Sequence, residues 1–136
     1  MHSYPVVYIS FAEMIGDTYE SVVIRLKSIM MDLYYNYKFL LKSDKIEDSE
    51  KERINNVLFG RANEDELTFA LKELCRYLRD YYGVKPILLI DEYDVPLQEA
   101  YVNGIYNKVS KLVKSLYLSS LKLNPYLKRA VVTRSI

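Results

Sequence analysis

Midway along the chain runs the sequence Lys85-Pro86-Ile87-Leu88-Leu89-Ile90-Asp91-Glu92-Tyr93-Asp94. Four consecutive aliphatic residues, with no polar side chain between them, are typical of a strand buried on both faces of a parallel sheet. We therefore expect a central strand over about 86–91. The acids begin where the aliphatic run ends, so the sequence places carboxylates at the carboxyl end of that strand.

Two further segments have the same apolar character. Residues 4–11 are rich in β-branched and aromatic side chains, which predicts a strand there. Residues 129–133 predict a third, short strand that ends at Thr133. If the order of the strands in the sheet follows the sequence, Thr133 lies beside the end of the strand that carries Asp91.

Between these strands, apolar residues recur at helical spacing. Asp17, Ser49 and Asn63 each precede an acidic residue by three positions, which is the pattern of a helix cap. We expect helices over about 18–41, 50–59, 64–82 and 105–122. Strands that alternate with helices in this way predict one α/β domain with a parallel sheet and right-handed crossovers.

The acids after residue 90 suggest chemistry. Ligands of open α/β sheets bind beyond the carboxyl ends of the strands. Asp91 there can hold a magnesium ion beside the phosphates of a nucleotide, and Glu92 can orient and deprotonate the attacking water, which is the logic of a Walker B element. Thr133 can touch the terminal phosphate or that water. The alternative is that Asp91, Glu92 and Asp94 are solvated acids at the start of a loop, and that Thr133 is an ordinary strand residue.

Other kinds of site are excluded by the composition. A phosphate-binding loop needs closely spaced glycines and a lysine, whereas Gly16, Gly60, Gly83 and Gly104 lie far apart and none precedes a lysine. One histidine and one cysteine cannot make a zinc site or a histidine-assisted nucleophile. An acid-x-Lys partner for Asp91, as in a metal-dependent nuclease, is missing as well.

Charge is distributed unevenly along the chain. Residues 1–100 carry a net charge of −6, and residues 101–136 carry +7 without a single acid. The lysines of the 105–122 helix can contact nucleic acid or a partner protein, or can simply form a solvated helix face. The 14 tyrosines can stack on bases, although packing in the core and at its rim is the commoner use.

Residues 85–100 resemble the Walker B region of the bacterial AAA-ATPase-like family. Residues 4–11 are similar to the second strand of that family, and residues 124–133 to the approach to its sensor strand. Its members are large proteins that often carry a PD-(D/E)xK nuclease-like domain behind the ATPase. The resemblance runs through nearly the whole chain.

This resemblance implies a partial P-loop NTPase-like domain over residues 1–136, with a three-layer fold and a short parallel sheet flanked by helices. It makes Asp91 the magnesium-associated acid, Glu92 the catalytic base and Thr133 a sensor-like polar group. Asp94 belongs to the signature and is grouped with Asp91 as cofactor-binding. ATP and Mg²⁺ are implied for the intact parent, and neither is expected to bind tightly to this chain.

The chain departs from the family in two places. The family has a strand and a Gly-Lys-Ser type loop ahead of the segment where this chain starts, and it usually has glycine after the threonine, where this chain has Arg134. We therefore expect an internal fragment or truncated member of the family, inactive or nearly so by itself, whose partner is the remainder of the ATPase domain or of the parent chain. The 130–133 strand is then an unpaired edge that favours self-association. Without a signal peptide or membrane span, the chain is expected to be cytoplasmic.

Overall fold

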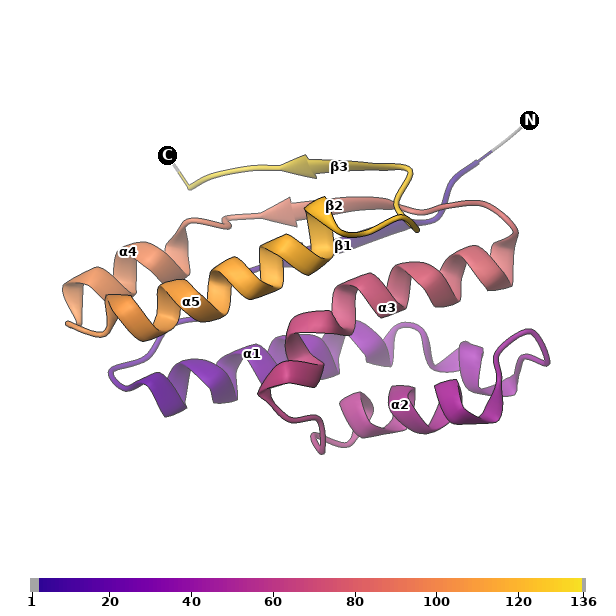
Figure 1. Ribbon diagram of the computed structural model, residues 1–136, viewed down its shortest axis with the longest axis horizontal. Coiled ribbons are helices and arrows are strands. Elements are labelled where there is room, and N and C mark those ends of the chain that lie inside the picture. The colour runs from indigo at the N-terminus through magenta and orange to yellow at the C-terminus, as the bar shows by residue number, and fades with distance from the viewer. Residues whose placement is uncertain (1–2, 136) are drawn as a thin grey trace.

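The computed structural model describes residues 3–135, and its elements alternate as the sequence predicts (Figure 1). The strands β1 (Val6–Ser10), β2 (Ile87–Asp91) and β3 (Arg129–Val132) form one parallel sheet in the order β1-β2-β3. β2 is central, and its register places Ser10 opposite Asp91 and Val132 opposite Ile90. The predicted α/β fold with a short parallel sheet is confirmed.

Five α-helices occur among the described residues. They are α1 (Tyr19–Tyr35), α2 (Asp48–Leu58), α3 (Glu64–Tyr82), α4 (Val95–Val102) and α5 (Tyr106–Tyr117). A 3₁₀ turn, η1 (Lys38–Lys42), follows α1, and a π-helical turn, η2 (Leu118–Lys122), continues α5. The 64–82 helix has the bounds that the sequence predicts. Asn63 caps its start, and Gly83 ends it in the left-handed conformation at φ 76°.

The prediction of one helix over 18–41 is wrong beyond Tyr35. The amides of Asn36 and Tyr37 donate to carbonyls three residues back, which tightens the chain and ends the helix. The Tyr37 hydroxyl then donates to the carbonyl of Val6 at 3.3 Å, and Leu40 becomes fully buried in η1. Contacts with the sheet therefore outweigh the helical periodicity of the sequence.

The short helix α4 was not predicted. Its eight residues bury only Pro96 and Ala100, so it lacks the apolar stripe that identifies a helix in sequence. Pro96 lies in its first turn, where the missing amide proton costs no intrahelical hydrogen bond. α4 matters for the site because it begins directly after residues 91–94.

The helices pack against one face of the sheet (Figure 1). Val7, Ile9, Leu88 and Ile90 point into that interface and are buried. On the opposite face the alternate residues, among them Tyr8 and the other exposed side chains Val6 and Val131, are not covered by the described part of the chain. Two of the three layers implied by the resemblance are thus present. Among residues 3–135, no helix is both long and apolar enough to cross a membrane.

Candidate functional site

Asp91 is the last residue of β2, and its carboxylate is held by hydroxyl groups from both neighbouring strands. The Thr133 hydroxyl, directly after β3, donates to Oδ1. The Tyr8 hydroxyl, from β1, donates to Oδ2 at 3.0 Å. The predicted proximity of Thr133 and Asp91 is therefore confirmed. Tyr8 was not predicted as a site residue, although the alternation of side chains along a strand gives a signal for it. Tyr8 pairs with Leu89, which lies two residues before Asp91 and therefore on the same face of the sheet.

These hydrogen bonds set the charge of Asp91. The Thr133 hydroxyl contributes most and the Tyr8 hydroxyl next, and together they lower the pKa of Asp91 below its ordinary value. The same contact raises the pKa of Tyr8, because a phenolate beside the carboxylate is disfavoured. Asp91 is consequently an anion at neutral pH, with Tyr8 and Thr133 as neutral donors.

Glu92 is held differently. Its φ of 53° is left-handed, a conformation that costs a residue with a side chain about 1–3 kcal/mol. Within residues 3–135, its carboxylate has no hydrogen-bond partner. The strained backbone and the unpaired carboxylate therefore meet in one residue, directly after the carboxyl end of the central strand.

The turn around Glu92 is fixed from two sides. The amide of Tyr93 donates to the carbonyl of Thr133 at 3.2 Å, which ties the turn to β3. The hydroxyl of Tyr117, on α5, donates to the carbonyl of Tyr93 from the helical side. The ring of Tyr117 also contacts the rings of Phe11 and Tyr93 edge-on. This support holds the left-handed residue in place.

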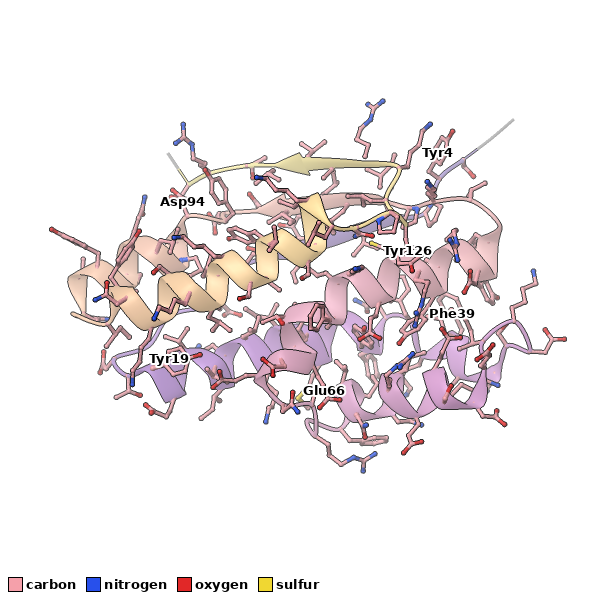
Figure 2. The ribbon with its side chains drawn as sticks, viewed as in Figure 1. Tyr4, Tyr19, Phe39, Glu66, Asp94 and Tyr126 are labelled. Carbon is pink, nitrogen blue, oxygen red and sulfur yellow. The ribbon has the colours of Figure 1, made fainter. Side chains whose placement is uncertain are left out.

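Asp94 lies largely buried at the start of α4 (Figure 2). Its carboxylate accepts hydrogen bonds from the Ser135 amide and hydroxyl, both at 3.0 Å, and from the Gln98 side chain at 2.9 Å. The Ser135 amide is the largest cause of its lowered pKa. These contacts fasten residues 133–135 to α4 and leave little of the carboxylate for a ligand. The assignment of Asp94 to cofactor binding stays a prediction.

The donor set can accept a magnesium ion. Mg²⁺ prefers oxygen ligands and is usually bound by one or two carboxylates together with waters and substrate phosphates, and not by an all-protein cage. Asp91 supplies an ionised carboxylate of this kind, beside the hydroxyl of Thr133. Among the described residues no group of three or more His, Cys, Asp or Glu side chains is placed to hold a metal. The residues therefore fit magnesium in the presence of a phosphate ligand.

Comparison with known proteins gives one match. The family model of the AAA-ATPase-like proteins, described as predicted AAA-ATPases, matches residues 1–134. No curated protein and no solved structure matches the chain. The match covers every residue of the site except Ser135.

Proposed function

Because the chain belongs to the predicted AAA-ATPase family, we propose that residues 91–94 and Thr133 are the Walker B and sensor part of a site that hydrolyses ATP. The observation that carries the proposal is the position of Asp91 and Glu92. They are consecutive carboxylates at the carboxyl end of the central strand, one ionised by two hydroxyl donors and one free.

Each residue has a separate part in this proposal. Asp91 would hold magnesium through a water molecule, and the ion would supply positive charge to the β- and γ-phosphate oxygens. Glu92 orients and deprotonates the attacking water, for which its unpaired carboxylate is suited. Thr133 fixes the orientation of Asp91. Asp94 is a positioning residue that keeps the segment after β3 against α4.

The phosphate contacts must come from elsewhere. The 136 residues contain no Gly-rich loop with a lysine, and stabilisation of the phosphates is most of the catalysis of phosphoryl transfer. The uncovered sheet face and the free edge of β3 are suitable places for the remainder of an ATPase domain to pack. We infer that the residues described above act within a larger domain.

Steady-state ATP hydrolysis by the complete domain tests the proposal. Glu92→Gln is expected to lower kcat by roughly 100-fold or more while ATP still binds, because it removes the base and keeps the shape. Asp91→Asn is expected to weaken the dependence of the ATP hydrolysis rate on Mg²⁺. The exposed Glu99→Gln on α4 is the matched control and should hydrolyse ATP at the normal rate. A Glu92→Gln variant with unchanged kcat would contradict the proposal.

The isolated chain gives a second measurement. Without the phosphate loop we expect no saturable binding of ATP by calorimetry at sub-millimolar concentrations, with or without Mg²⁺. A micromolar isotherm would show that the phosphates are held by residues of this chain, and the division of labour proposed here would then be incorrect.

A further inference from the structure

The end of the molecule opposite Asp94 carries aromatic rings paired with cations. Figure 2 shows Tyr4, Phe39 and Tyr126 at that end and Asp94 at the other. Four aromatic–cation pairs occur here among the described residues: Lys38 with Tyr35, Lys45 with Tyr81, Arg79 with Tyr126, and Lys128 with Tyr4, at 4.5 to 5.9 Å from the ring centroids. The proposed ATPase function uses none of them.

Aromatic rings also contact one another in this region. Phe39 packs against Tyr81 at 5.0 Å between ring centroids, and Tyr81 against Tyr82 at 4.9 Å. Tyr37 contacts Phe39 and is fastened to the start of β1 through its hydroxyl. Tyr82 is nevertheless 50% exposed and Phe39 37% exposed. The cluster is thus a set of mutually packed rings with ring surface open to solvent.

The segments that carry these rings are rich in basic residues. They come from η1, from the loop after it, from the loop that precedes β2 and from the start of β3: Lys38, Lys42, Lys45, Lys85, Lys128 and Arg129. The acids in the same segments are Asp44, Glu47, Asp48 and Asp80, and Asp80 is already bonded to Arg79 at 2.8 Å. Cations therefore outnumber acids in the segments that carry the rings.

The lysines of α5 have different neighbours. Lys108 and Lys111 line a hollow of about 350 Å³ together with Glu64 and Asp65, which reduces their positive field. Lys108 also lies over the ring of Tyr19, whose hydroxyl is bonded to Glu64. The basic helix is thus a weaker surface for a polyanion than its sequence indicates.

We propose that the aromatic and basic surface formed by Tyr35, Lys38, Phe39, Lys45, Tyr82 and Lys128 binds single-stranded nucleic acid. Proteins that bind single strands combine cations that follow the phosphates with aromatic rings on which the bases stack. Both are present here as paired cations and rings. Stacking requires unpaired bases, so the surface should prefer a single strand to a duplex. An anionic membrane would instead favour a continuous apolar face with cations at its rim, an arrangement that these interleaved pairs do not have.

Fluorescence anisotropy with a labelled oligothymidylate of about 20 nucleotides, longer than the sites of most single-strand binders, tests the proposal. We expect saturable binding by the whole chain at low salt. If three lysines contact phosphates, affinity should fall roughly 20-fold between about 50 and 200 mM salt. The duplex of the same length should bind at least several-fold more weakly.

Variants locate the surface. Tyr82→Ala should weaken binding roughly fivefold to 100-fold through lost stacking, and Lys38→Gln together with Lys45→Gln should reduce the salt dependence. Phe39→Ala is a second stacking variant, checked for folding by its thermal transition. Lys111→Gln with Lys114→Gln on α5 is the matched control of equal charge change and should bind normally.

Several results would overturn the proposal. One is the absence of binding at low salt. Others are equal affinity for single strand and duplex, loss of binding in the α5 control and not in Tyr82→Ala, or binding only to vesicles that contain anionic lipid. Because Asp91→Asn leaves this surface unchanged, normal oligonucleotide binding by that variant separates this inference from the proposed ATPase function.

Discussion

At the scale of single residues, Asp91 and Glu92 are neighbours with the same functional group and opposite surroundings. Asp91 is held by two hydroxyl donors and kept ionised, whereas Glu92 is unpaired on a left-handed backbone. The difference arises from the end of the strand. Asp91 is still part of β2, whose side chains alternate between the two faces of the sheet, and its side chain points to Tyr8. Glu92 begins the turn into α4.

The left-handed conformation of Glu92 should lower stability. Glu92→Gly is expected to raise the free energy of unfolding by roughly 1 kcal/mol relative to Glu92→Ala, because glycine adopts positive φ without a steric cost. Both variants lose the carboxylate, so their difference isolates the backbone. Urea denaturation of the two proteins measures it. Equal midpoints would mean that Glu92 is not strained.

The lowered pKa values of Asp91 and Asp94 predict a loss of stability in acid. Both carboxylates ionise at a lower pH in the folded chain than in the unfolded chain, whose value is about 3.9. Below about pH 5 the unfolded chain therefore binds more protons, and the stabilisation disappears as pH falls through the folded pKa. Urea midpoints measured from pH 7 to pH 3 should fall more steeply for the native sequence than for Asp94→Asn. Parallel pH profiles would contradict the prediction.

At the scale of elements, the caps show what the sequence could and could not predict. Asn63 has one plausible partner, Glu66, and the predicted cap is present in both directions. For α2 the cap predicted at Ser49 is wrong: the helix begins two residues earlier, with Glu47 at its cap, and the Glu47 amide donates to the Glu50 carboxylate at 3.2 Å. Glu50 is chosen because it is also buried beside Arg76, at 2.9 Å, a contact that depends on α3 and is invisible in local sequence.

The two caps give a matched pair of substitutions. Asn63→Ala should lower the free energy of unfolding by about 1 kcal/mol, because the Glu66 amide loses its acceptor. Ser49→Ala should change it by less than about 0.5 kcal/mol, since Ser49 is exposed and already inside α2. Thermal or urea unfolding of both variants checks the assignment. A larger effect at Ser49 would place the start of α2 where the sequence pattern suggested.

The elements of the site were predictable to different degrees. Asp91, Glu92 and Thr133 follow apolar runs, and the topology of parallel sheets brings such positions to one edge. Tyr8 and Tyr117 are recognised only once the register and the packing of α5 are known. The contacts of Asp94 with Ser135 cross 41 residues and have no local signal.

At the scale of the whole molecule, the sheet formed within residues 3–135 is open on one face and at its two edges, β1 and β3. Tyr8 is 55% exposed, and Val6 and Val131 are nearly half exposed, whereas the alternate residues Val7 and Leu88 are fully buried. A parallel sheet normally has both faces covered. The apolar open face and the unpaired backbone groups of β3 are thus available to another chain.

We therefore expect the isolated chain to self-associate through β3. Analytical ultracentrifugation should show an average mass that rises with protein concentration, because edge pairing removes Val131 and its neighbours from water. Val131→Lys should suppress the association, since a charge at a strand edge opposes pairing. Val102→Lys, at the exposed end of α4, is the matched control and should associate like the native chain. A strictly monomeric native chain would show that the open face is stable in water. It would contradict the expectation that another chain or domain must cover that face.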